Sequence, residues 1–100
     1  MKITITPLMM HAGLRKECLY CPTALAVAAS LNEPAHVQVN TDFIYVYFHD
    51  GKRFIYKVSK NLKRWISNFD AALPIPSDSY TFSLAIYEII ENPWRVYAHA

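Results

Sequence analysis

The stretch "HVQVNTDFIYVYFHDGKRFIYKV", residues 36–58, decides the fold because it contains the strongest β-hairpin signal in the chain. Runs of β-branched and aromatic residues stand on both sides of Asp50-Gly51, and Asp-Gly is a favoured dipeptide of the two-residue type I′ turn. We therefore predict one strand that enters the segment, followed by two antiparallel strands joined at Asp50-Gly51.

A two-residue turn would also fix the register of this hairpin and hence its two faces. One face would hold the pairs His49 and Lys52, Tyr47 and Phe54, Tyr45 and Tyr56, and Phe43 and Val58. The other face would hold Ile44, Val46, Phe48 and Ile55, with Arg53 and Lys57. Because neither face is plainly polar, we expect both faces to be at least partly covered.

The segments on either side of the hairpin predict two helices and further strands. Residues 2–6 alternate as a half-buried strand, and a loop follows through His11 and Gly13. A helix is expected over residues 22–31, with Cys21 as N-cap and Pro22 in the first helical position. A second, amphipathic helix is expected over residues 59–73, with Ser59 as N-cap. Its apolar stripe would consist of Leu62, Trp65, Ile66, Phe69 and Leu73.

The C-terminal region gives a weaker signal. Residues 80–87 alternate well enough for a strand, and residues 94–97 would form a last short strand after a turn at Asn92-Pro93. A helix over residues 83–91 stays open, because the apolar residues there follow neither period cleanly.

These elements predict a single α+β domain over residues 1–100. It would have a mainly antiparallel sheet of four to five strands with two helices packed on one face, and Trp65 and Phe69 would be buried against the aromatic side of the hairpin. A composition of 53% hydrophobic and 18% charged residues fits a packed globule.

The longest apolar stretch, Ala24 to Ala29, is too short for a membrane span, and no signal peptide is evident. We therefore expect a cytoplasmic protein.

Cys18 and Cys21 are the chemically most distinctive residues of the chain. They could form a redox pair, but Pro22 leaves the first cysteine in the loop, whereas a nucleophilic cysteine belongs at the cap. They could form half of a zinc site with His11, although four ligands are usual. We favour a third interpretation, in which both are reduced thiols and Cys21 caps the helix. We expect no cofactor.

Catalytic motifs are missing from the sequence. It contains no GxSxG, P-loop or HExxH pattern, and its two glycines leave no phosphate-cradling loop. The acidic residues are scattered singly. We therefore predict a binding module that is not an enzyme.

Basic residues are concentrated in one window, although the net charge is only +2. No acidic residue lies from Gly51 to Phe69, so the window can attract an anionic partner. Its candidate contacts to nucleic acid or another anion are Lys52, Arg53, Lys57, Lys63 and Arg64. The neighbouring aromatic residues Tyr45, Tyr47, Phe54 and Tyr56 suit single-strand binding by stacking. The segment lacks the glycines of the RNP1 pattern.

The apolar hairpin face offers the competing partner class, another protein. Ile44, Val46, Phe48 and Ile55 would form a patch that is unfavourable in water. The simplest way to bury this face is against a second copy of the chain, so we predict a homodimer. A fold-back of the C-terminal extension is the alternative.

Several short motifs together suggest a relationship. They are Ile3 to Thr6, His11 with Gly13, the helix start Cys21, Pro22, Ala24, Leu25 and Ala26, and later Phe69-Asp70 and Tyr80 to Phe82. In this arrangement the chain resembles a group of small phage-encoded proteins of unknown function, over roughly residues 2–84. The longer C-terminus, Ile86 to Ala100, departs from that pattern. The resemblance implies an accessory protein that binds a host or phage macromolecule in the host cytoplasm, and it lends no activity.

Overall fold

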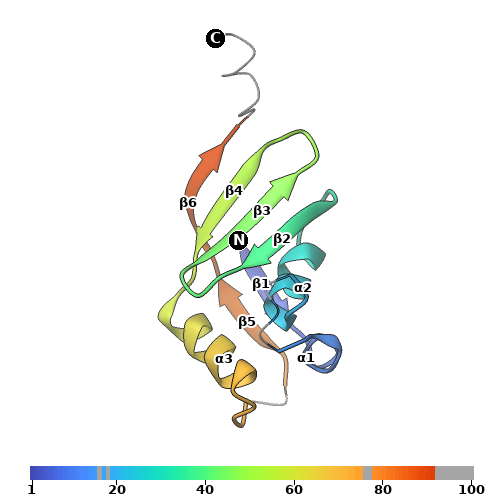
Figure 1. The fold of residues 1–100 in the computed structure, drawn as a ribbon, viewed down its shortest axis with the longest axis vertical. Coiled ribbons are helices and arrows are strands. Elements are labelled where there is room, and N and C mark those ends of the chain that lie inside the picture. Colours follow the sequence, from blue (N-terminus) through green and yellow to red (C-terminus); the bar gives the residue numbers. More distant parts are fainter. Residues whose placement is uncertain (16, 18, 76–77, 92–100) are drawn as a thin grey trace.

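The computed structural model describes residues 1–15, 17, 19–75 and 78–91, and shows an α+β fold (Figure 1). In chain order the elements are β1 (Lys2–Ile5), α1 (Pro7–Ala12), α2 (Pro22–Ala29), β2 (Ala35–Val39), β3 (Phe43–Phe48), β4 (Arg53–Lys57), α3 (Lys60–Asp70), β5 (Tyr80–Ser83) and β6 (Ala85–Ile90). All strand pairs are antiparallel, as predicted. The turn and strand predicted over residues 92–97 lie outside the described residues.

The strands form two sheets where we predicted one. β1 pairs with β5, and the other sheet has the order β2-β3-β4-β6. Buried Leu84 lies where the chain passes from one sheet to the other: its N–H donates to the carbonyl of Met1 at 2.7 Å, and its own carbonyl accepts from the Met1 amino group at 3.1 Å. Residues 85–90 then pair with β4, so the segment left open between strand and helix is a strand.

Both predicted helices are present, with the predicted caps. The thiol of Cys21 accepts a hydrogen bond from the Ala24 N–H at 3.4 Å, and the Ser59 hydroxyl accepts one from the Leu62 N–H at 3.2 Å. α3 ends at Asp70, earlier than predicted, because Ala72 takes a left-handed conformation with φ 57°. Leu73 therefore leaves the apolar stripe and is 54% exposed.

α1 was not predicted, since we expected a loop through His11 and Gly13. Thr6 caps it by accepting the Met9 N–H at 3.2 Å, and Pro7 takes the first helical position. The Thr-Pro pair is thus the same start signal as Cys21-Pro22. Gly13 then allows α1 to approach α2, because a Cβ at Gly13 would lie 2.5 Å from Cδ of Pro22.

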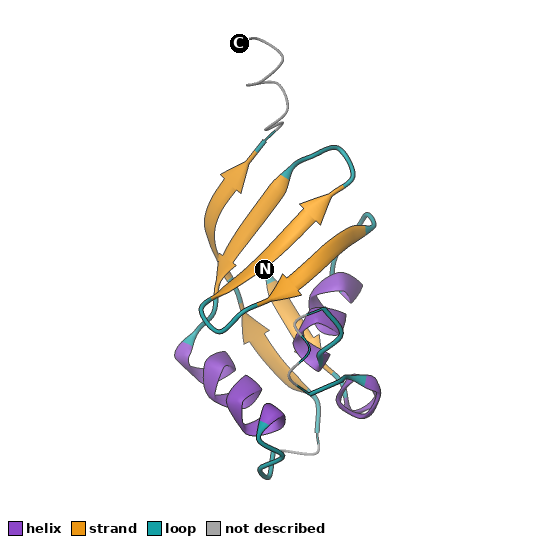
Figure 2. Ribbon diagram, in the orientation of Figure 1, coloured by secondary structure: helices purple, strands orange, loops and turns teal. Residues whose placement is uncertain are grey.

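The core lies between one face of the four-stranded sheet, the β1–β5 sheet and the helices. Trp65 and Phe69 are buried in it, as predicted, with their rings stacked at 5.5 Å. Trp65 also makes an edge contact with Phe82 of β5 at 6.4 Å, and Tyr56 of the hairpin belongs to the same buried cluster. Figure 2 shows the helices gathered toward one end, with the tip of the β3–β4 hairpin extending beyond them.

The predicted two-residue turn is wrong, and this error matters most for function. The Phe48 N–H donates to the Lys52 carbonyl at 2.9 Å, so the loop has three residues, His49-Asp50-Gly51. Gly51 has φ 89°, the left-handed residue that such a loop needs, and the Lys52 N–H donates to Oδ1 of Asp50 at 2.9 Å. The pairing of β3 with β4 is thereby shifted by one residue from the prediction.

Candidate nucleic-acid interface on the open sheet face

The shifted register exchanges the side chains of β4 between the two faces of the sheet. Tyr56 now lies opposite Ile44, and Phe54 lies opposite Val46, so all four face the core. Ile55 and Arg53 instead accompany the tyrosines of β3. A one-residue slip has this effect because side chains alternate between faces along a strand.

The predicted apolar docking patch is therefore not a surface. Ile44 and Val46 are both 0% exposed and belong to the domain's own core. Phe48 is half-buried on that same side, whereas Ile55 is half-buried on the opposite side. The homodimer that was predicted through these residues loses its stated interface, because they cannot meet a partner together.

The opposite side of the sheet, which we call the open face, carries aromatic and basic side chains. Residues on it alternate with the buried residues of the same strands and are half-exposed or exposed. They are His36 and Gln38 of β2, Phe43, Tyr45 and Tyr47 of β3, and Arg53, Ile55 and Lys57 of β4.

The rings of the open face form a row along and across the strands. Tyr45 and Tyr47 have nearly parallel rings, with centroids 6.3 Å apart and planes at 18°. His36 lies 6.3 Å from Tyr47 at one end, and Phe43 lies 4.9 Å from Tyr87 at the other. Sequence reasoning missed His36 and Tyr87, because only the strand order of the sheet brings them beside β3.

Two of the five basic candidates, Arg53 and Lys57, lie on this face. Arg53 is opposite Tyr47, with its guanidinium carbon 5.4 Å from the ring centroid, and Lys57 is opposite Phe43. Both are exposed, and within the described part of the chain neither forms a salt bridge. Glu88 of β6, paired with Ile55, adds a carboxylate at the edge.

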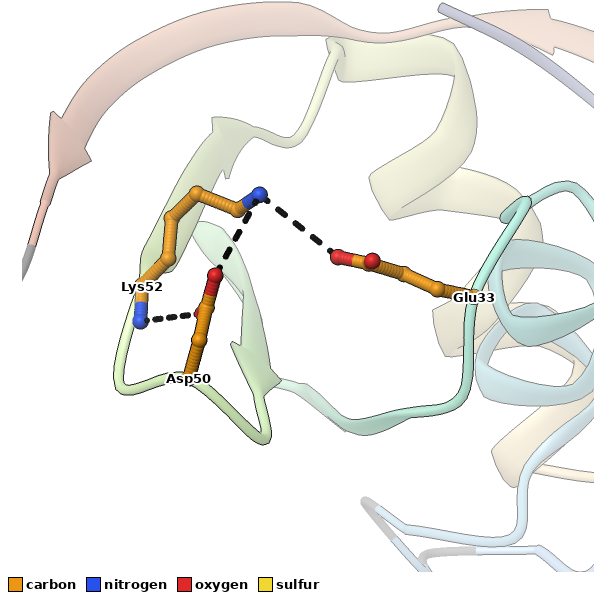
Figure 3. A network of polar contacts seen from close by, with 3 residues as sticks. All are labelled: Glu33, Asp50 and Lys52. Carbon is orange, nitrogen blue, oxygen red and sulfur yellow. Dashed lines mark hydrogen bonds and ion pairs between the residues drawn. The ribbon is translucent and has the colours of Figure 1, made fainter.

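Lys52 lies elsewhere and is already engaged. Its ammonium group is 3.5 Å from Oε1 of Glu33 and 3.8 Å from Oδ2 of Asp50 (Figure 3). The same group lies 4.8 Å from the ring centroid of Phe48 and 5.6 Å from that of Phe54. Lys52 therefore covers the half-buried aromatic pair at the core-side end of the hairpin.

Lys63 and Arg64 are separated from the open face because they belong to α3. That helix buries Leu62 and Trp65 in the core on the other side of the sheet. The Lys63 ammonium group lies 3.0 Å from Oδ1 of Asp42, while Arg64 is exposed. The sequence window was thus one patch along the chain but is not one patch in space.

The cysteine candidates are only partly placed. Cys18 lies outside the described residues, whereas Cys21 is buried and His11 is exposed at the end of α1. Burial raises the pKa of the Cys21 thiol above its usual 9.0, and the nearby Asp70 carboxylate adds to the rise. A nucleophilic thiol needs a lowered pKa, so Cys21 is suited to capping. Across the described positions no three His, Cys, Asp or Glu side chains form a metal-binding group.

The pKa of Cys21 predicts a loss of stability in alkaline solution. Because its folded-state pKa is raised, the thiol stabilises the folded state fully below pH 9.0 and progressively less as the pH rises above that value. Urea unfolding should show wild type losing more stability between neutral pH and pH 10 than Cys21→Ser, which keeps a capping oxygen and does not titrate. Tyr56, whose pKa burial also raises, contributes equally to both proteins. Parallel pH curves would contradict the prediction.

Neither family models, curated proteins nor solved structures yield a match to this chain. None of the described helices combines the length and apolarity needed to cross a membrane.

Proposed function

We propose that the protein is a non-enzymatic binding module that holds single-stranded nucleic acid on its open face. The observation that carries the proposal is the position of Arg53 and Lys57 on the same face as the rings of Phe43, Tyr45 and Tyr47. The two-residue turn predicted from the sequence would place these basic residues and the two tyrosines on opposite faces.

Half-exposed rings on a sheet suit the bases of a single strand. Stacking on an aromatic ring tolerates any base, because every base has a π face. Tyr45 and Tyr47 present nearly parallel rings, and Tyr47 also contacts His36, so adjacent bases would find neighbouring stacking surfaces. A sheet face has no protruding helix to enter a duplex groove, which favours unpaired bases over double-stranded DNA.

The two cations suit the phosphates that follow such bases. Arg53 and Lys57 flank the ring row from the neighbouring strand, within reach of a backbone that runs along it. Their charges are exposed, and the nearby carboxylates of Glu33 and Asp50 pair with Lys52 while that of Asp42 pairs with Lys63. The phage context and the host cytoplasm stay predictions, and the proposal does not depend on them.

Fluorescence anisotropy with labelled single strands of DNA and RNA tests the proposal. Site sizes of such surfaces are about 4–16 nucleotides, so oligonucleotides of roughly 16 bases are suitable probes. Tyr45→Ala or Tyr47→Ala should weaken binding by about 1–3 kcal/mol, or roughly 5- to 150-fold. Arg53→Gln and Lys57→Gln should each lower the slope of log K against log salt by about 0.7.

Arg64→Gln is the matched control, because Arg64 is also exposed but lies on α3. It should leave both the affinity and the salt slope near those of wild type. Absence of binding at low salt would remove the proposal. Equal losses in Arg64→Gln and Arg53→Gln would show diffuse charge attraction without a site on the open face.

A further inference from the structure

β6 is an edge strand with apolar side chains on both of its faces. It pairs with β4 on one side, and within the described part of the chain no strand pairs with its other side. Ile86, Tyr87 and Ile89 are 50%, 60% and 47% exposed. Edge strands are often protected by Lys, Pro, short length or a β-bulge; this six-residue strand has neither Lys nor Pro, and its pairing with β4 contains a bulge between Ile55 and Tyr56. The free edge of β6 could therefore form backbone hydrogen bonds with another strand, and its exposed apolar side chains could pack against it.

Because of a β-bulge, the sequence of core-side and open-face residues along β6 is the same in both chain directions. Ile86 pairs with Tyr56 and Ile89 with Phe54, so both isoleucines are on the core side. The open-face residues are Ala85, Glu88 and Ile90, which pair with Lys57, Ile55 and Arg53, and Tyr87, whose ring contacts Phe43 at 4.9 Å. From residue 85 to residue 90 the order is open, core, open, open, core, open. This order is the same when it is read backwards.

We propose that β6 pairs antiparallel with β6 of a second copy, about a two-fold axis between Tyr87 and Glu88. In this register Ile86 lies opposite Ile89 of the second copy, and Tyr87 lies opposite Glu88 of the second copy. A shift by one residue in either direction would place core-side residues against open-face residues. One of those shifts would also place Glu88 directly against its own copy, where like charges repel. Face order and charge therefore select the same register, and an isologous contact of this kind closes as a dimer.

The pairing would join the two four-stranded sheets into one. The exposed surfaces of Ile86 and Ile89 would become covered, and Tyr87 would lie near the two-fold axis on the shared open face. This inference uses β6 alone and does not require the proposed nucleic-acid binding. It differs from the dimer surface predicted from the sequence, of which Ile44 and Val46 lie in the core and Ile55 lies on the opposite face.

Light scattering coupled to size-exclusion chromatography, without nucleic acid, tests the pairing over a wide micromolar range of concentration. Wild type should be a dimer. Ile86→Lys should raise the dissociation constant roughly tenfold or more, because two symmetry-related contacts are changed at once. The double variant Ile86→Lys with Ile89→Glu should restore the dimer, since each new charge would lie opposite its complement.

Leu8→Lys is the control, because Leu8 is an exposed apolar residue on α1, at 76% exposure. It should leave the dimer unchanged, and circular dichroism should show that all variants are folded. A wild type that stays monomeric throughout the range would overturn the inference. Dimerisation of Ile86→Lys with wild-type affinity, or failure of the charge pair to restore the dimer, would also overturn it.

Discussion

Trp65→Ala should lower the free energy of unfolding by about 3 to 5 kcal/mol, and Phe69→Ala should have an effect of the same size. Both side chains are nearly fully buried, at 5% and 6% exposure, and their rings are stacked. Each truncation would leave a cavity that the surrounding β-sheet cannot fill. A domain of this size has a total stability of about 5 to 15 kcal/mol, so either change removes a large share of it.

Urea unfolding followed by circular dichroism gives the measurement, and Leu73→Ala is the matched control. Leu73 was predicted in the same apolar stripe, but it lies beyond the end of α3 and is exposed. Its truncation should change stability by no more than about 0.5 kcal/mol. The double variant at Trp65 and Phe69 should cost less than the sum of the single variants, because the two rings share a contact. Near-wild-type stability of Trp65→Ala would mean that α3 is not packed in the core.

Local signals predicted most of the helices and strands. The Cys21-Pro22 and Ser59 caps specify α2 and α3 through a few neighbouring residues, so their starts were predictable from sequence. The start of α1 carried the same type of signal in Thr6-Pro7 and could have been found by it. The pairing of β1 with β5 joins residues about 80 positions apart, and no local pattern encodes such a contact.

The candidate site was harder to predict because it depends on whether the β3–β4 loop has two or three residues. Asp50-Gly51 fits both a two-residue turn and the last two positions of a three-residue loop. A change from two to three loop residues moves every β4 side chain, including Arg53 and Lys57, to the other face relative to β3. The residues of the candidate interface were thus visible in the sequence, but their arrangement on a common face depends on one additional loop residue, His49.

Adjacent lysine substitutions on β3 would test which of its two faces is buried. Ile44→Lys should destabilise the fold by more than about 4 kcal/mol, because it removes a fully buried side chain and places an unpaired charge in the core. Tyr45→Lys should cost only about 1 kcal/mol, because the half-exposed Tyr45 lies on the open face, where the ammonium group can reach water. Thermal and urea unfolding of the two variants, purified side by side, provide the comparison.

The order of the two stabilities carries more weight than either value. The open-face register requires Ile44→Lys to be the less stable variant by a wide margin. The predicted arrangement, with the helices packed on the aromatic face of the hairpin, requires the reverse, since it directs Tyr45 toward the helices and Ile44 away from them. A reversed order would mean that the tyrosines of β3 are buried, and the proposed nucleic-acid interface would then lose the exposed rings on which it depends.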